Sequence, residues 1–513
     1  MKTIQTDVLV IGTGFGAAAP ALRLAQAGAK VVMIEKGPPV ETADFRQTSD
    51  PKYVLKYLKG TPGDNLKLTY AEALGGGSGF YEMISLRAPS LAFEQLDEDG
   101  RLLWPADVDR RSLDPYYDLA ERMLHVSQIP VEEIPKTGLV FAHLMRNLGY
   151  SVDRCRYAVR GCQGSGFCVT GCVYGAKQSL FLNYLPQAVS AGAEIETDLE
   201  ALAIEPLPAR WRVGAPLRDV PYRYRVTARR RTGERELVAF VARVVILGGG
   251  TVGTAKLLLA SRPYLPKLSE HVGRHIAYNG SVKVAALLPD GVPDADMFTG
   301  RTHPGMVSYQ FLGSHGITVH AVKAMPLMLV SAAHLRLRDE PQAAFWGAPN
   351  VELMKQLRHR MIILDAFGLT PPGAALQVRA GDARVALPIT AQLRVYHAET
   401  KRILESILVR NGCRLVETDF LDKTFMPRQG IQFSTAHQVG SCRMADAKEH
   451  GVVDASGAVF DYPGLYVSDG SAIPSSLAVN TSLTILANAE RIAAGLIERY
   501  RLPLPGGSQA QAA

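Results

Sequence analysis

The fold is decided by the stretch DVLVIGTGFGAAAPALRLAQAGAKVVMIEKG, which runs from Asp7 to Gly37. Residues 7–11 are a short, β-branched apolar run of the kind buried in a parallel sheet, and residues 17–26 have a helical composition. A second apolar run then carries the chain to Glu35. The stretch therefore predicts a strand, a glycine turn, a helix and a second strand, which is how a dinucleotide-binding sheet begins.

Three glycines and one acid in this stretch predict a bound dinucleotide. Gly12 permits the tight turn, Gly14 lets the backbone approach a pyrophosphate, and Gly16 lets the helix pack on the strand. Glu35 follows about twenty residues later, where a carboxylate holds ribose hydroxyls. This favours an adenosine diphosphate group without a 2′-phosphate, and it does not separate NAD from FAD.

The composition argues against several classes of function. The chain has 513 residues and a formal net charge of +7, and it contains no apolar run long enough to cross a bilayer. We interpret its short basic segment, residues 223–231, as a solvated strand face, so we expect no nucleic-acid partner and no membrane span. The opening MKTIQTD leads directly into an apolar strand and leaves no room for a signal peptide. We therefore expect a cytoplasmic protein.

Several further segments occur in an order that is typical of one family. They are LGGGSGF at residues 74–80, LGGGTVGTAKLLLAS at 247–261, TAHQVGSCRM at 435–444, and a block at 451–493 that closes with VNTSLTILANAERIA. Together with the opening fingerprint they resemble the glucose-methanol-choline (GMC) oxidoreductase family, and within it most of all the bacterial cholesterol-oxidase-like branch.

The resemblance implies an α/β fold, α+β overall, in which a Rossmann-like FAD-binding domain is joined to a substrate domain with an antiparallel β-sheet. Alternating apolar and polar residues between about 281 and 433 independently predict such a sheet. We expect a discontinuous FAD-binding domain of residues 1–45, 155–285 and 435–513, and a substrate-binding domain with cap elements of residues 46–154 and 286–434.

The resemblance also implies FAD as the cofactor. The glycine turn and Glu35 would hold its adenosine and pyrophosphate half, and Asp469 would lie near the ribityl or pyrophosphate portion. The second glycine loop, residues 75–79, would pass the isoalloxazine edge. The expected cofactor-binding residues are Gly12, Gly14, Phe15, Gly16, Glu35, Lys36, Gly76, Gly77, Ser78, Gly250, Asp469, Gly470, Asn480 and Ser482.

Oxidation of an alcohol requires a group that accepts the hydroxyl proton, and histidine titrates in the useful range. His437 occupies the family's histidine position in HQVGSCRM, and Asn480 occupies the second polar position. The resemblance implies that His437 accepts or orients the proton while Asn480 donates a hydrogen bond to the substrate oxygen or the flavin. A helix predicted after Asn480 would direct its partially positive N-terminus into the site.

One segment departs from the branch's pattern. The branch usually continues its glycine loop with an asparagine and small residues, whereas this chain has Phe80, Tyr81 and Glu82. We therefore expect bulk and a carboxylate close to the flavin ring.

Four of the six cysteines crowd into one stretch, at Cys155, Cys162, Cys168 and Cys172. Soft thiolates at such spacing can bind zinc or an iron-sulfur cluster. The spacings reproduce neither a standard ferredoxin run nor a paired zinc knuckle. We prefer a plain loop packed beneath the flavin, with no metal, and keep iron-sulfur ligation as the alternative.

The sequence as a whole predicts an FAD-dependent oxidoreductase that moves a hydride from an apolar alcohol to the flavin and leaves a carbonyl. An alicyclic or steroid-like alcohol is the first candidate substrate, and oxygen or an electron carrier is the expected acceptor. Two alternatives stay open: a dehydrogenase subunit that passes electrons through an iron-sulfur cluster to a redox partner protein, and a non-redox or light-driven enzyme on the same flavin scaffold.

Overall fold

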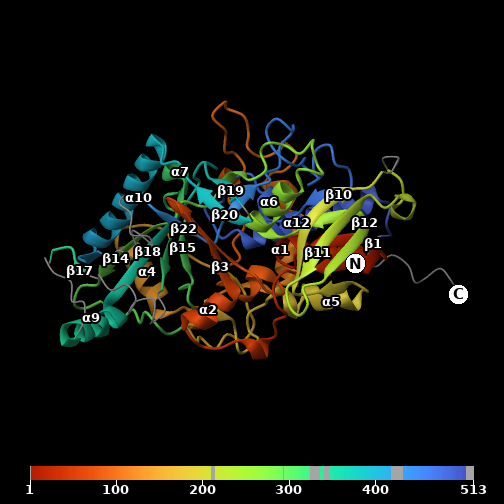
Figure 1. Cartoon of the computed structure of the whole chain (residues 1–513). Helices are drawn as coiled ribbons and strands as arrows, with labels where there is room; N and C mark the ends of the chain where they lie inside the picture. The colour runs from red at the N-terminus through yellow and green to blue at the C-terminus, as the bar shows by residue number, and fades with distance from the viewer. Residues whose placement is uncertain are drawn as a thin grey trace.

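The computed structural model describes residues 2–208, 214–292, 294–323, 336–339, 347–379, 381–417 and 431–503 (Figure 1). Their first large sheet has the order β10-β11-β12-β1-β2-β9, and β24 also pairs with β12. The pairings of β1 with β12 and β2, of β2 with β9 and of β12 with β24 are parallel. The strands are β1 (Lys2–Ile11), β2 (Val31–Ile34), β9 (Glu194–Glu196), β10 (Leu199–Pro206), β11 (Tyr224–Arg230), β12 (Leu237–Leu247) and β24 (Leu465–Val467).

Helices cover this sheet. They are α1 (Phe15–Gln26), α5 (Tyr184–Ser190), α6 (Gly250–Ser261) and α12 (Ser482–Arg499). Of these, α1 and α6 begin at or beside its glycine turn. Small residues let α1 pack closely, because five of its positions are buried alanines. Arg23 of α1 forms an ion pair with Glu490 of α12 at 2.8 Å, and the Tyr184 hydroxyl of α5 donates to the same carboxylate at 2.8 Å. One buried acid thus joins three helices.

A second sheet lies at the other end of the molecule, on the left of Figure 1. Its order among the described residues is β17-β21-β14-β18-β16-β15-β7, and each pairing is antiparallel. The strands are β7 (Asp153–Arg154), β14 (Val282–Leu287), β15 (Met306–Ser308), β16 (Ile317–Val322), β17 (Arg336–Leu337), β18 (Met361–Gly368) and β21 (Arg414–Glu417). Around it lie α4 (Lys136–Asn147), α9 (Gly347–Arg360) and α10 (Ala391–Arg410).

The predicted fold class is confirmed, since a mainly parallel sheet with covering helices stands beside an antiparallel one. The exact division into domains stays a prediction, and β14 spans the expected boundary at residue 285. The other described elements are α2 (Pro51–Tyr57), α3 (Arg110–Met123), α7 (Leu312–His315), β3 (Leu58–Thr61), β4 (Gly63–Asp64), β5 (Leu66–Ala71), β6 (Val126–Gln128), β8 (Arg156–Ala158), β13 (Arg274–Ala277), β19 (Ala375–Arg379), β20 (Asp382–Ala386), β22 (Phe433–Thr435) and β23 (Val439–Ser441). No helix within these ranges is both long enough and apolar enough to cross a membrane.

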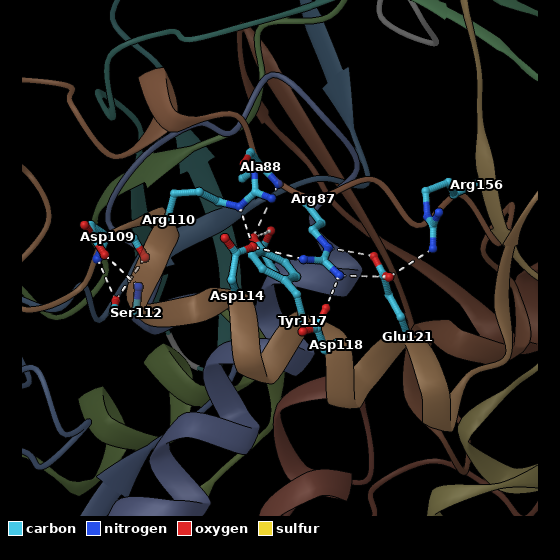
Figure 2. Close-up of polar contacts among 11 residues, drawn as sticks. Arg87, Ala88, Asp109, Arg110, Ser112, Asp114, Tyr117, Asp118, Glu121 and Arg156 are labelled. Carbon is cyan, nitrogen blue, oxygen red and sulfur yellow. Dashed lines mark hydrogen bonds and ion pairs between the residues drawn. The ribbon is translucent and has the colours of Figure 1, made fainter.

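An ion-pair network ties the segment after the second glycine loop to α3 (Figure 2). The Arg87 guanidinium lies 2.8 Å from Glu121, and Arg156 shares that carboxylate at 3.0 Å. Arg87 also reaches two further acids of α3, Asp114 and Asp118. On the same helix, the Tyr117 hydroxyl is 2.8 Å from Thr484 Oγ1 of α12. The ion pairs therefore hold α3 against the segment around Arg87, and the Tyr117 hydroxyl joins α3 to the helix whose N-terminus follows Asn480.

Candidate functional site

Two glycines of the first turn are required by close packing. Gly12 has a φ of +101°, and a Cβ there would lie 2.4 Å from the carbonyl oxygen of Gly248. A Cβ at Gly16 would lie 2.2 Å from the Cα of Asp469. A side chain at either position would push the turn away from the segments that follow β12 and β24.

The middle glycine of the turn, Gly14, leaves the N-terminus of α1 without a side-chain cap. Gly14 caps this helix without a side-chain hydrogen bond, so its first backbone N–H groups are available to an anion. A Cβ at Gly14 would meet only the Cα of Gly76, at 4.0 Å, so the two glycine segments face each other. The Phe15 ring turns aside and packs edge-on against Tyr81, with ring centroids 5.3 Å apart.

Glu35 lies at the end of β2, where the sequence predicted a ribose contact. Its Oε2 accepts hydrogen bonds from Thr13 N at 3.1 Å and Thr13 Oγ1 at 2.7 Å, and its Oε1 accepts one from Gly37 N at 2.7 Å. Thr13 Oγ1 in turn accepts a bond from Gly75 N at 2.9 Å. Burial raises the pKa of the Glu35 carboxyl, and these hydrogen bonds oppose the rise. Thr13, which sequence reasoning missed, thus links both glycine segments to the acid.

Asp469 is bonded within the protein on both carboxylate oxygens. Oδ2 accepts from Gly250 N at 2.7 Å and Thr254 Oγ1 at 2.6 Å, and Oδ1 accepts from Ser471 N at 2.8 Å. Asp469 therefore fixes the N-terminus of α6 and the short helix that begins at Gly470. Its geometry is that of a residue that positions the backbone around it.

Lys36 and Ser78 are likewise engaged with protein groups. Lys36 Nζ lies 2.7 Å from Glu72 and 3.5 Å from Glu200. Ser78 Oγ donates to the Gly75 carbonyl at 2.7 Å, so it closes the second glycine loop on itself. A Cβ at the neighbouring Gly77 would meet no atom within 4 Å, so this loop leaves space beside it.

Lys177 holds the second glycine loop through hydrogen bonds, a role that the sequence did not predict. Its Nζ donates to the carbonyl oxygens of Gly79 at 2.9 Å and Cys168 at 2.5 Å. Burial lowers the pKa of Lys177 to about 8, and the neighbouring Cys168, Cys172 and Glu82 oppose the shift. The available sequence signal was the GAK that ends the cysteine-rich stretch.

Phe80 and Glu82, which follow the second glycine loop, lie in different environments. Phe80 stacks on Tyr57, with centroids 5.1 Å apart, and meets Phe45 edge-on within a separate apolar cluster. Glu82 lies in a polar environment, where burial raises the pKa of its carboxyl and the positive Lys177 opposes that rise. The Phe80 ring thus packs in a separate apolar cluster, whereas the Glu82 carboxyl stays close to Lys177.

The structure brings His437 and Asn480 together. Asn480 Nδ2 lies 3.1 Å from His437 Nε2, in a contact that joins the turn between β22 and β23 to the start of α12. Burial, with a contribution from the positive Lys283, lowers the pKa of His437 to about 4. The Phe367 ring meets the imidazole edge-on at 4.7 Å. Among the described residues, the buried Oδ1 of Asn480 has no hydrogen-bond partner.

Helix α12 begins at Ser482, as predicted, and its N-cap Thr481 makes no side-chain cap. Its first backbone N–H groups therefore have no side-chain partner, and they lie next in the chain to Asn480, whose Oδ1 also has none among the described residues. The loop before it is held by Asn279, whose Nδ2 donates to the Val479 carbonyl at 2.8 Å and whose Oδ1 accepts from Leu477 N at 2.8 Å. The substrate-side segment thereby fixes the position of Asn480.

The four clustered cysteines do not gather into one ligand set in the part of the chain that the structure describes. Cys155 lies instead with His303 and His320, in the one group of three or more suitable ligand side chains found there. Cys162 Sγ accepts a bond from Gly164 N at 3.4 Å, and Cys168 and Cys172 lie near Lys177. Iron-sulfur ligation by all four thiols keeps only its sequence spacing as support.

Comparison with known proteins connects this site to a family. A sequence profile described as GMC oxidoreductase matches residues 7–276, and a second one matches residues 396–489. A cholesterol oxidase of Mycobacterium tuberculosis (strain ATCC 25618 / H37Rv) is 27% identical, with 95% of this chain and 90% of that protein covered. A long-chain-alcohol oxidase of Arabidopsis thaliana is 23% identical, with 96% of this chain and 68% of that protein covered.

Solved structures agree on the fold. A formate oxidase superposes with a TM-score of 0.66 at 14% identity, over 98% of this chain and 99% of that one. Pyridoxine 4-oxidase from Mesorbium loti gives a TM-score of 0.66 at 16% identity, over 96% of this chain and 99% of that one. Because the first profile alone covers more than half of the sequence, the protein belongs to the GMC oxidoreductase family, whose members bind FAD and act on CH–OH donors.

Proposed function

We propose that this protein oxidises the hydroxyl group of an apolar alcohol to a carbonyl, with His437 and Asn480 as the catalytic pair. The observation that carries the proposal is the 3.1 Å contact between Asn480 Nδ2 and His437 Nε2. Two polar atoms that converge in this way can both bond to one substrate oxygen. Both residues are half-buried, and the Phe367 ring covers one side of the imidazole.

The residues present fit FAD. The uncapped N-terminus of α1 at Gly14 would hold the pyrophosphate, and Glu35 would accept from the ribose hydroxyls. The uncapped N-terminus of α12 and the open space beside Gly77 would adjoin the flavin ring. When bound, FAD supplies the hydride acceptor.

His437 is suited to accept a proton because it is held neutral. Its pKa of about 4 leaves the imidazole uncharged near neutral pH, and the Asn480 amide donates to Nε2, so the lone pair lies on that nitrogen. A substrate hydroxyl that enters the site displaces the Asn480 amide from Nε2, gives its proton to that nitrogen, and accepts a hydrogen bond from Asn480 Nδ2 instead. Loss of the O–H proton promotes departure of the carbon-bound hydrogen with its electron pair, and the C–O bond becomes a carbonyl.

One apolar contact and the named relatives support an apolar substrate. Phe367 is the second-last residue of the buried strand β18 and lies against His437. The similar proteins named for cholesterol and for long-chain alcohols point to the same class. Both of these relatives are named oxidases, so oxygen is the first acceptor to test.

A panel of alcohols tests the proposal. Holoenzyme is mixed without oxygen with a sterol, an alicyclic alcohol, a long-chain primary alcohol and glucose, and loss of flavin absorbance is followed. We expect at least one apolar alcohol to reduce the flavin about a hundredfold faster than glucose does. Reduction by glucose alone, or by none of the apolar alcohols, would contradict the proposed substrate class. Admission of air to the reduced enzyme then distinguishes oxygen from a carrier as acceptor.

A further inference from the structure

Three buried ligand-type side chains lie together beyond the alcohol site. They are Cys155, between β7 and β8, His303, before β15, and His320, on β16; their exposed fractions are 0%, 1% and 0%. One sulfur or nitrogen atom from each lies within 4.8 Å of the other two. We propose that these residues bind a borderline-soft divalent cation, with zinc as the expected occupant.

The spacing of the two imidazoles suits such a cation. His303 Nε2 and His320 Nδ1 are 3.3 Å apart. Two nitrogens bound to tetrahedral zinc at 2.0–2.1 Å are separated by about 3.4 Å. The two rings therefore already have the separation of two ligands in one coordination shell.

The outer nitrogens of both histidines have hydroxyl partners, which fix the orientation of the rings. His303 Nδ1 is 3.0 Å from Tyr157 Oη, which donates to the His303 carbonyl at 3.1 Å. His320 Nε2 is 3.0 Å from Thr318 Oγ1, which donates to the Ala478 carbonyl at 2.5 Å. A hydroxyl that has donated its single hydrogen can only accept another bond. This places the hydrogen of His320 on Nε2 and its lone pair on Nδ1, which faces His303. His303 Nδ1 also accepts from Gly305 N at 3.3 Å, so without a cation the His303 hydrogen lies on Nε2, between the two rings, and a bound cation would take its place.

Cys155 supplies the third ligand. Its sulfur makes no hydrogen bond within the described ranges, and burial raises the pKa of its thiol when no cation is present. Cation binding forms the metal–sulfur bond and releases the thiol proton to solvent. One thiolate and two imidazoles are a donor set that suits zinc or copper better than magnesium or calcium. Without a metal, His303 would instead accept from Gly305 N, 3.3 Å away, and donate directly to His320.

The position of this site connects it to the catalytic pair. Thr318 holds the carbonyl of Ala478, two residues before Asn480. The Phe367 ring packs against both His320, at 4.8 Å, and His437, at 4.7 Å. A bound cation would therefore brace the substrate-side sheet behind the alcohol site. It takes no part in the proposed oxidation itself.

Elemental analysis of holoenzyme tests the site. Because the ligands are buried, the cation must enter before folding is complete, so the protein is produced in medium that contains zinc and copper and is then washed with chelator. We expect about one metal ion per FAD, falling below about a tenth in Cys155→Ala and His320→Gln. Cys413→Ala, which removes a different buried thiol, should keep its metal. Unmodified holoenzyme with less than about a tenth of an ion per FAD would overturn the proposal.

X-ray absorption keeps the test decisive if the buried variants do not fold. Zinc in the unmodified holoenzyme should show one sulfur neighbour at about 2.3 Å and two imidazole nitrogens at about 2.0–2.1 Å. Copper with the same neighbours would support the site and replace zinc as its occupant. A metal with oxygen neighbours only would show surface binding and would contradict the assignment. Neither result bears on the alcohol oxidation, which the substrate panel tests separately.

Discussion

At the scale of single residues, the protonation state of His437 sets the pH range of the reaction. Its pKa is lowered to about 4, first by burial and then by Lys283. In the proposed mechanism the neutral imidazole is the proton acceptor, so the rate constant for flavin reduction should be constant from about pH 8 down to 6 and fall about tenfold per pH unit below 4. Stopped-flow reduction without oxygen, with FAD content checked at each pH, measures this profile. An acid limb centred near pH 6.5 would show that His437 titrates like an exposed histidine.

Glu35 should control retention of the cofactor. The carboxylate is fixed by Thr13 and Gly37 at the end of β2, in the position where it can accept ribose hydroxyls. Glu35→Ala should weaken FAD binding at least about tenfold, the scale of a charge-assisted hydrogen bond. Glu194→Ala removes an exposed acid from the neighbouring strand β9 and serves as the control. FAD titration of both apoproteins makes the comparison, and equal affinities would contradict the ribose contact.

The residues that sequence motifs predicted are those whose role depends on local pattern. The glycine turn identifies Gly12 and Gly14, and the family motifs identify His437 and Asn480, which the structure places in contact. Thr13 and Lys177 were missed because their partners come from distant segments. Thr13 accepts from Gly75, 62 positions away, and Lys177 donates to Gly79, 98 positions away. Side-chain contacts over such separations follow only from the folded chain.

At the scale of elements, the attachment of α3 to the segment that follows the second glycine loop should depend on Arg87. This residue forms ion pairs with three acids of α3, of which Glu121 is the least exposed (Figure 2). Arg87→Ala leaves that acid with Arg156 alone and should lower the free energy of unfolding by about 1–3 kcal/mol. Arg122→Ala, at an exposed position of the same helix, should change it by less than about 0.5 kcal/mol. Urea denaturation of the three holoenzymes measures both values, and equal midpoints would exclude a stabilising role for Arg87.

Element types were predictable, whereas their pairing was not. Periodicity and composition gave the strand, turn and helix at the start of the chain and the helix that begins just after Asn480. Alternation between residues 281 and 433 gave the antiparallel sheet. Its order was out of reach because β7, from near residue 153, joins β15 at its edge, and β14 pairs with β18 and β21. Strand order is set by long-range packing, which local pattern does not encode.

At the scale of the whole molecule, the candidate site draws its residues from both sheets. The parallel sheet contributes the glycine turn and Glu35, the antiparallel sheet contributes Phe367 and Lys283, and α12 brings Asn480 to His437. Figure 1 shows these sheets at opposite ends, with α1 and α12 beside the first. The family motifs fall on the cofactor side, which is why they identified it in detail. The substrate side lacks such motifs, so its buried histidines could be found only in the structure.

The central claim is that His437 accepts the hydroxyl proton, and His437→Gln tests it most directly. Glutamine can keep a polar contact with Asn480 but cannot act as a base near neutral pH. Reduction of bound FAD by the best alcohol of the panel is followed without oxygen in this variant and in His315→Gln, which alters an exposed histidine. The account predicts full FAD content in both, with reduction at least about a hundredfold slower in His437→Gln alone. Undiminished reduction in His437→Gln would remove His437 from the chemistry.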